Sequence, residues 1–159
     1  GGAVLPARPL SVLFLCTGNS CRSQMAEGWA RRLHPVVLAP HSAGVESHGL
    51  NSLAVQVMAE AGVDISRQRS KTVGELGAAT FDAVVTVCDH ARSACPVPPP
   101  AAVILHAPFA DPPALAVSAR SEEEALACYR RVRDEIRAFV AALPAQLAVA
   151  NGGAGKETP

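Results

Sequence analysis

The sequence predicts an α/β fold, a three-layer arrangement in which a four-stranded parallel sheet carries helices on both faces. Two observations lead to this prediction. Short apolar runs typical of buried strands alternate along the chain with stretches whose apolar residues recur every three or four positions, as in amphipathic helices. Strands that alternate with helices pair in parallel and are joined by right-handed crossovers. The length of 159 residues suits one domain, which we place at residues 10–144, with 1–9 and 145–159 as terminal extensions.

Charge and cysteine content argue against several classes of protein. Fourteen Lys and Arg residues balance fourteen Asp and Glu residues, so no broad basic surface for nucleic acid is expected. No apolar run approaches the roughly 20 residues that cross a membrane, and the opening residues lack the pattern of a secretion signal. Five unevenly spaced cysteines do not resemble a disulfide framework, which favours a reducing compartment. We therefore expect a cytoplasmic monomer without a metal ion or other cofactor.

Four apolar runs account for the predicted strands. They are residues 10–15, 36–42, 81–87 and 103–106. The first helix begins near Ser23 and ends before Pro35, because the residue that precedes a proline avoids the helical conformation. The second helix begins at a cap supplied by Asn51 or Ser52 and stops at Gly62.

A third long helix is expected near the end of the chain, after a short helix at 73–79. Ser121 and Glu124 form a capping box at its start, where acidic side chains complement the positive helix end. Pro144 is expected to end this helix. Residues 146–159 show no further periodicity, and we expect a loosely held tail there.

Residues 16–23 join the first strand to the first helix, and their types suit an anion-binding loop with a nucleophile. Cys16 closes the strand, while Arg22 and Ser23 open the helix. Backbone N–H groups at a helix start lack partners and the dipole is positive there, so an oxyanion can bind and the thiolate is favoured over the thiol. Arg22 can grip two oxygens of the anion across from the sulfur. A cysteine that closes a strand can also serve packing alone, but this combination favours a nucleophile.

The residues between Cys16 and Arg22 are expected to bind the anion mainly through their backbone N–H groups. They are Thr17, Gly18, Asn19, Ser20 and Cys21. Gly18 and Asn19 tolerate the left-handed backbone that such a loop needs. Ser23 can donate its hydroxyl proton to the Cys16 thiolate, cap the helix, or do both.

A known family shares the string that begins at Cys16, which reads Cys-Thr-Gly-Asn-Ser-Cys-Arg-Ser-Gln-Met-Ala-Glu-Gly-Trp. Its first eight residues are similar to the Cys-x5-Arg-Ser signature of the low-molecular-weight protein tyrosine phosphatase superfamily. The full string resembles the thioredoxin-coupled arsenate reductases within that superfamily. The similarity covers about 10–143 and includes Ser42-Ala43-Gly44, Cys88 and Cys95-Pro96. It implies the same four-stranded parallel sheet flanked by helices.

Cys88 and Cys95 distinguish the two branches of this superfamily. A phosphatase needs one thiol, whereas a reductase must supply two electrons, which two thiols provide when they become a disulfide. The two cysteines could instead be ordinary loop residues. They could also form a zinc site with His90 and His106, although six residues between the cysteines is unlike usual zinc spacing. We favour the redox interpretation.

The resemblance implies a three-step reaction with electrons from thioredoxin. Cys16 attacks arsenate held by the loop and Arg22, and water is lost. Cys88 attacks the adduct, arsenite departs, and a Cys16–Cys88 disulfide remains. Cys95 then displaces Cys16, and thioredoxin reduces the Cys88–Cys95 disulfide. The alternatives are a phosphotyrosine phosphatase and, less favoured, a non-enzymatic sensor of anions or arsenicals.

Four further residues enter the prediction. Asp111 suits a turn, and the resemblance implies that its carboxyl group is a general acid and base. Cys21 and Cys128 are expected to be structural, the latter on the apolar face of the last helix. Lys71 stands where some family members carry an aspartate that binds potassium. Its ammonium group is therefore expected to replace the cation and pair with Glu27, although an ordinary surface lysine is the alternative.

Overall fold

A parallel sheet of four strands forms the centre of the computed structural model, which describes residues 8–88 and 98–156, the last six of them as backbone only. The strands lie in the order β2-β1-β3-β4, and each neighbouring pair is parallel. Their bounds are β1 (Leu10–Cys16), β2 (Leu38–Gly44), β3 (Phe81–Thr86) and β4 (Ala101–His106). The predicted parallel sheet with flanking helices is confirmed.

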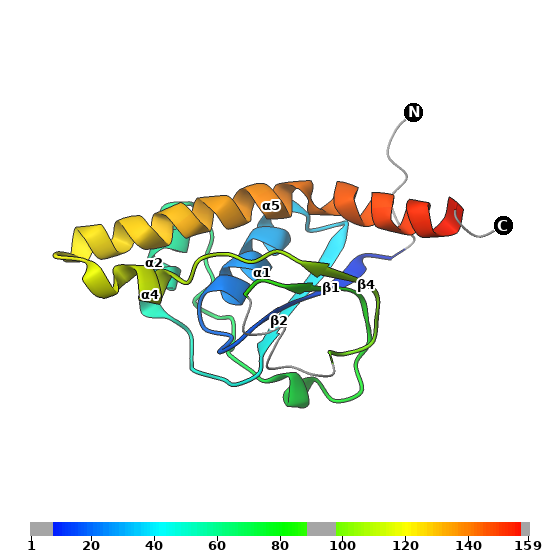
Figure 1. The fold of residues 1–159 in the computed structure, drawn as a ribbon, viewed down its shortest axis with the longest axis horizontal. Coiled ribbons are helices and arrows are strands. Elements are labelled where there is room, and N and C mark those ends of the chain that lie inside the picture. The colour runs from blue at the N-terminus through cyan, green and yellow to red at the C-terminus, as the bar shows by residue number, and fades with distance from the viewer. Residues whose placement is uncertain (1–7, 89–97, 157–159) are drawn as a thin grey trace.

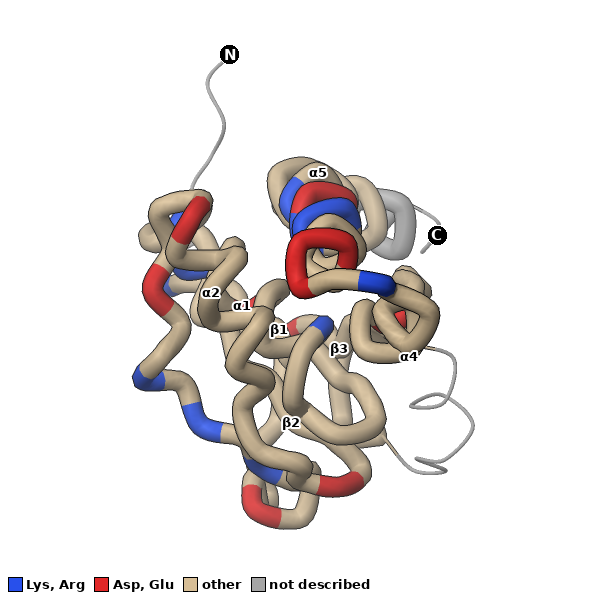
Figure 2. Tube along the Cα trace, turned by 90° about the vertical axis from the view of Figure 1, so that its left-hand side faces the viewer, with Lys and Arg blue, Asp and Glu red and all other residues tan. Residues whose placement is uncertain are grey.

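The helices that follow the strands differ greatly in length. They are α1 (Arg22–Leu33), α2 (Ser52–Glu60), the 3-10 turn η1 (Val73–Leu76), α4 (Pro112–Leu115), the 3-10 turn η2 (Ala116–Ser118) and α5 (Glu122–Lys156). Helix α5 runs along one side of the molecule and extends past the sheet (Figure 1). Its first turn carries three glutamates, and acidic residues at this end of the helix are red in Figure 2. Of the predicted capping box, the Glu124 N–H donates to Oγ of Ser121 at 3.1 Å, but the Glu124 carboxylate accepts from the Arg120 N–H rather than from that of Ser121. No helix in the described ranges is long and apolar enough to cross a membrane.

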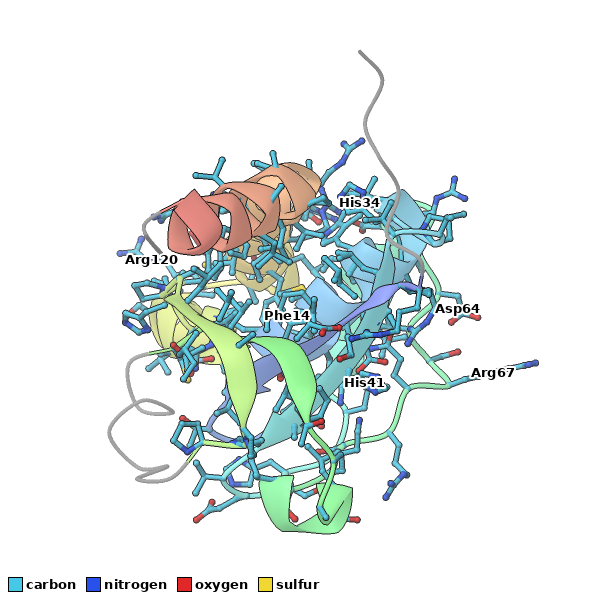
Figure 3. The ribbon with its side chains drawn as sticks, turned by 90° about the vertical axis from the view of Figure 1, so that its right-hand side faces the viewer. Phe14, His34, His41, Asp64, Arg67 and Arg120 are labelled. Atoms are coloured by element: carbon cyan, nitrogen blue, oxygen red, sulfur yellow. The ribbon has the colours of Figure 1, made fainter. Side chains whose placement is uncertain are left out.

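The core is centred on β1, whose side chains are buried on both faces of the sheet. Val12, Leu13 and Phe14 are fully buried, and Figure 3 shows Phe14 in the middle of the molecule. Helix α1 covers this region and packs against α5 through Trp29, whose ring Nε1 donates to the Arg133 carbonyl oxygen at 3.1 Å. This packing holds the start of α1 against the carboxyl end of β1.

The register of the sheet brings two cysteines to one edge. Leu15 of β1 lies opposite Thr86 of β3, and the Val87 N–H donates to the Leu15 carbonyl oxygen at 2.9 Å. Cys16 is the last residue of β1 and Cys88 lies two residues after the end of β3, so both thiols stand at the carboxyl ends of neighbouring strands. In parallel sheets, ligands bind at this carboxyl edge.

The prediction that the last helix ends at Pro144 is wrong, because α5 continues to Lys156. A proline inside a helix deprives the carbonyl oxygen four residues earlier of its N–H partner. That oxygen belongs to Val140, and His34 Nε2 donates to it at 2.9 Å instead. Leu147, in the predicted tail, is 1% exposed. Tertiary packing and one substitute hydrogen bond thus carry the helix through the proline.

Other boundaries shift by a few residues. Strand β2 begins at Leu38 rather than at residue 36, because residues 35–37 form a turn in which the Leu38 N–H donates to the His34 carbonyl oxygen. The cap at Asn51 is confirmed, since its side chain accepts from two backbone N–H groups of α2. The short helices α4 and η2, over 112–118, were not predicted.

Candidate active site

A pocket of about 320 Å³ lies at the carboxyl edge of the sheet, where the loop after β1 meets the start of α1. Cys21 is the N-cap of α1, and its side chain forms no capping hydrogen bond within the described residues, which leaves first-turn N–H groups to face the pocket. Such a helix start attracts anions. The pocket is lined by Cys16, Thr17, Gly18, Ser20, Cys21, Arg22, His48, Asp111 and Pro113. It therefore brings together the predicted nucleophile, the arginine and the aspartate.

The backbone of the loop is fixed by the segment that follows β2. Glu46 and His48 donate their N–H groups to the carbonyl oxygens of Thr17 and Gly18, at 2.8 and 2.9 Å. Asn19 adopts φ 46°, so the predicted left-handed conformation is confirmed at this residue. Gly18 has a different role, because a Cβ there would lie 2.3 Å from Nδ1 of His48. The glycine is needed for this close contact rather than for a positive φ.

Cys16 is 3% exposed and has a short contact with a hydroxyl group. Its Sγ lies 2.7 Å from Oγ of Ser23, and Nδ2 of Asn19 donates to that same oxygen at 2.9 Å. Ser23 lies inside α1 rather than at its cap. The arrangement agrees with the predicted contact between Ser23 and the sulfur. Ser23 is not the N-cap of the helix, because Cys21 holds that position.

Arg22 links the loop to the segment after β4. Its Nη1 donates to the Phe109 carbonyl oxygen at 2.9 Å, and its Nη2 lies 3.5 Å from Oδ1 of Asp111. Asp111 is the N-cap of α4, yet its carboxylate makes no capping hydrogen bond with the described residues of that helix. The carboxylate lies instead at the pocket, where it can exchange a proton with a bound group. No pattern in the sequence predicted the contact with Phe109.

Cys88 is fully buried at the end of β3, next to the loop. Its Sγ lies 3.4 Å from Oγ1 of Thr17, the residue that follows Cys16. The second predicted thiol is therefore adjacent to the loop that begins at Cys16. Cys95, the third, lies outside the described residues, as does His90 of the zinc alternative. Among the described residues, no group of three or more His, Cys, Asp or Glu side chains could hold a metal ion.

The other two described cysteines have different surroundings. Burial raises the pKa of the Cys21 thiol far above its ordinary value, and the negative charges of Asp111 and Cys16 add to this effect. Cys21 therefore stays protonated, in agreement with a structural role. Cys128 lies on α5 and is half-buried. The four described cysteines are all free thiols.

Lys71 contacts Glu27, as the sequence predicted, and it also contacts Asn19 in the loop after β1. Its ammonium Nζ lies 3.9 Å from Oε1 of Glu27 and donates to the Arg69 carbonyl oxygen at 3.0 Å. Its backbone N–H donates to Oδ1 of Asn19 at 2.8 Å. Burial lowers the pKa of Lys71, and the nearby charge of Glu27 opposes that shift. The side chain is 15% exposed, so it is not an ordinary surface lysine.

The fold and the pocket define a class: a parallel-sheet domain in which a buried cysteine, an arginine and a helix start surround a pocket at the carboxyl edge of the sheet. The chain belongs to the low molecular weight phosphotyrosine protein phosphatase family, whose model matches residues 11–150. Two curated relatives are arsenate reductases, from Halalkalibacterium halodurans and from Bacillus subtilis. They are 47% and 48% identical over 125 residues, which is 79% of this chain and 88% of each relative.

Solved structures support the same placement. An arsenate reductase in a phosphate-binding state superimposes with a TM-score of 0.69 and 31% identity, over 87% of this chain and 98% of the other. A low molecular weight protein tyrosine phosphatase from T. tengcongensis has a TM-score of 0.68 and 28% identity, over 86% of this chain and 99% of the other. The fold alone therefore does not separate reductase from phosphatase.

Proposed function

We propose that the chain reduces arsenate to arsenite through Cys16, Cys88 and Cys95, with electrons from thioredoxin. The observation that carries the proposal is the 3.4 Å contact between Oγ1 of Thr17 and Sγ of Cys88. It places a second thiol beside the loop that holds the nucleophile. Hydrolysis of a phosphate ester has no need of that second thiol, whereas reduction does. The identity to curated arsenate reductases supports the same choice.

Arsenate, a tetrahedral oxyanion, fits a pocket formed by backbone N–H groups and a guanidinium group. The start of α1 supplies the N–H groups, and Arg22 supplies up to two parallel hydrogen bonds. The contact of 3.5 Å between Arg22 and Asp111 is long for an ion pair, so the guanidinium keeps donors for the substrate. The anion is then held above the sulfur of Cys16.

The first step forms a sulfur–arsenic bond. The Cys16 thiolate attacks arsenic, and one arsenate oxygen leaves as water after it has gained protons. Asp111, whose carboxyl group lines the same pocket, is the group that delivers a proton to that oxygen. The hydroxyl of Ser23, 2.7 Å from the sulfur, holds the nucleophile in place. Arsenic is still in its pentavalent state at this point.

The second step transfers the electrons. The Cys88 thiolate attacks the Cys16 sulfur, the sulfur–arsenic bond breaks, and its electron pair leaves with arsenic as trivalent arsenite. Two thiols have become one disulfide, which accounts for the two electrons. Cys95 then attacks Cys88 and releases Cys16 as a thiolate. The dithiol of thioredoxin reduces the resulting Cys88–Cys95 disulfide.

A coupled assay tests this function. Arsenate is supplied with thioredoxin, thioredoxin reductase and NADPH, and NADPH oxidation is followed at 340 nm. We expect arsenate-dependent oxidation that requires thioredoxin, and slow hydrolysis of an aryl phosphate by the same preparation. Absence of NADPH oxidation together with rapid aryl phosphate hydrolysis would instead identify a phosphatase.

A further inference from the structure

A chain of hydrogen bonds runs from the surface to Cys16 on the side of the loop that faces away from the pocket. It passes through buried side chains of α1 and of the loop after α2. From the surface inward its members are Arg31, Gln68, Gln24, Asn19 and Ser23. Neither Gln24 nor Gln68 lines the pocket. Gln24 is fully buried, and such a polar group is kept where its hydrogen bonds are needed.

The direction of the innermost bonds is fixed by the available protons. Nδ2 of Asn19 is a donor, so Oγ of Ser23 must accept from it. The hydroxyl has a single proton, and its other partner among the described residues is the sulfur of Cys16 at 2.7 Å. Ser23 therefore donates to the sulfur, an interaction that favours the thiolate over the thiol. This direction holds only while Asn19 presents its nitrogen to Ser23.

The orientation of the Asn19 amide is fixed from its other side. Its Oδ1 accepts from the backbone N–H of Lys71 at 2.8 Å, and a backbone N–H can only donate. Nε2 of Gln24 donates to the same Oδ1 at 3.0 Å and also to the Asn19 and Arg69 carbonyl oxygens. Three acceptors thus surround the Gln24 nitrogen, which leaves the Gln24 oxygen facing Gln68.

The outer half of the chain fixes Gln24 in turn. Nε2 of Gln68 donates to Oε1 of Gln24 at 2.8 Å and to the Gln24 carbonyl oxygen at 2.9 Å. Oε1 of Gln68 accepts from Nη1 of Arg31 at 2.8 Å, and a guanidinium can only donate. Nη2 of Arg31 is held by Glu27 at 2.8 Å. The side-chain amides of Gln68, Gln24 and Asn19 therefore each have one permitted orientation. It is set by Arg31 at one end of the series and by the Lys71 N–H at the other.

We propose that Gln68 and Gln24 are positioning residues that direct the Ser23 proton onto the Cys16 sulfur through Asn19. The inference rests on the proposed function only in taking Cys16 as the nucleophile. Gln68 is half-buried and lies in the loop after α2. The series of hydrogen bonds therefore connects that loop to the Cys16 thiol at the edge of the sheet. Its outer end opens at a surface hollow of about 410 Å³ lined partly by Arg31, Asp64 and Arg67. Figure 3 shows Asp64 and Arg67 on this side, with Arg67 directed outward.

Two variants of Gln68 interrupt the series of hydrogen bonds without changing any residue that lines the pocket. In Gln68→Glu the carboxylate keeps its contact with Arg31 but cannot donate to Gln24. In Gln68→Met all three of these side-chain hydrogen bonds, to Arg31 and to the two Gln24 oxygens, are lost at nearly constant volume. The matched control is Gln56→Glu, because Gln56 is an exposed glutamine on α2 with the same change of charge. Neither Gln68 variant alters the charged and titratable groups at the pocket, which are Cys16, Cys21, Arg22, His48 and Asp111.

The readout is the rate of Cys16 alkylation by iodoacetamide as a function of pH, resolved by peptide mass spectrometry. Cys128 in the same sample serves as the internal reference, and thermal unfolding is measured in parallel. Loss of one directing hydrogen bond is expected to slow Cys16 alkylation at pH 7 about three- to tenfold. The rate–pH profile should move to higher pH in both Gln68 variants, while Gln56→Glu and Cys128 keep the wild-type profile.

Two results would overturn the proposal. One is a wild-type alkylation profile of Cys16 in both Gln68 variants. The other is an equal loss of rate at every pH, which indicates a general structural role. Arsenate turnover does not enter this readout. A wild-type protein that fails to reduce arsenate would therefore overturn the proposed function and leave the alkylation result standing.

Discussion

The two described thiols at the sheet edge are equally buried but are held in very different ways. Cys16 is 3% exposed and Cys88 is fully buried, and they stand at the carboxyl ends of two neighbouring strands that are paired. The Cys16 sulfur contacts the Ser23 hydroxyl, which Asn19 holds by a further hydrogen bond. The backbone of Cys16 and of the loop after it accepts hydrogen bonds from the 45–48 segment. Among the residues that the structure describes, the Cys88 side chain has one polar contact, at 3.4 Å from Oγ1 of Thr17.

This difference matches two different tasks. A nucleophile works best when it is fixed in front of its substrate, because orientation before reaction lowers the barrier. A thiol that must bond first to one sulfur and then to another has to change partners. Strong hydrogen bonds would oppose that change, and a single weak contact does not. We therefore assign the fixed thiol to attack on the anion and the lightly held thiol to electron transfer.

The largest effect is expected from removal of the fixed thiol. Cys16→Ser should lower arsenite release in a single turnover on the order of 10³-fold or more, because the chemical step loses its nucleophile. Cys128→Ser, on the half-buried face of α5, is the control and should retain wild-type turnover. Substantial arsenite release by Cys16→Ser would assign attack on the anion to another group.

The next effect concerns recycling rather than chemistry. Cys95→Ser should release one equivalent of arsenite per protein and then stop, because the Cys16–Cys88 disulfide no longer passes to an exposed pair. Arsenite is quantified with and without thioredoxin, thioredoxin reductase and NADPH. Sustained thioredoxin-dependent turnover in this variant would contradict the relay. Cys128→Ser again provides the comparison.

A smaller effect is expected where Cys88 meets the loop. Thr17→Val keeps the shape of the side chain but removes its hydroxyl, so the rate of arsenite release in a single turnover should fall about three- to tenfold. Alkylation of Cys16 by iodoacetamide should change little, since Thr17 does not contact that sulfur through its hydroxyl. Thr80→Val, at an exposed position, is the control. An unchanged release rate would mean that the contact has no part in the second step.

The smallest effect is expected when sodium replaces potassium in the assay, where turnover should not change. The Lys71 ammonium already lies beside Glu27, under the loop that holds Cys16. Turnover in potassium chloride and in sodium chloride of equal ionic strength should agree within about twofold. The assay is run at pH 7, because burial lowers the pKa of Lys71 and its charge is lost at lower pH than that of an exposed lysine. A several-fold stimulation by potassium would show that Lys71 does not replace the cation.

Local patterns predicted most of the fold and the main parts of the pocket. The strand ends at Cys16 and Thr86, the cap at Asn51 and the stop at Gly62, which has φ 83°, all depend on residues close in sequence. Because carboxyl ends of parallel strands meet at one edge, the same patterns also predicted that Cys16 and Asp111 gather. Short-range rules were sufficient for these features.

Features that depend on distant partners were missed. Pro144 stays inside α5 because His34, 106 residues from Val140 in sequence, supplies the missing hydrogen bond. The pairing of Gln24 with Gln68 likewise joins residues 44 apart. Gly18 is required by the His48 ring rather than by its own φ. A single sequence contains no signal for such contacts until the chain is folded.

The central claim is that the lightly held thiol of Cys88 attacks the sulfur of Cys16, so that the two thiols together supply the electron pair that reduces arsenic. The most direct test treats Cys95→Ser with one equivalent of arsenate, quenches the reaction with acid and maps disulfides by peptide mass spectrometry. We predict one disulfide, between Cys16 and Cys88, formed in proportion to the arsenite released. Arsenite release with Cys88 still reduced, or with a Cys16–Cys21 disulfide in its place, would contradict the claim.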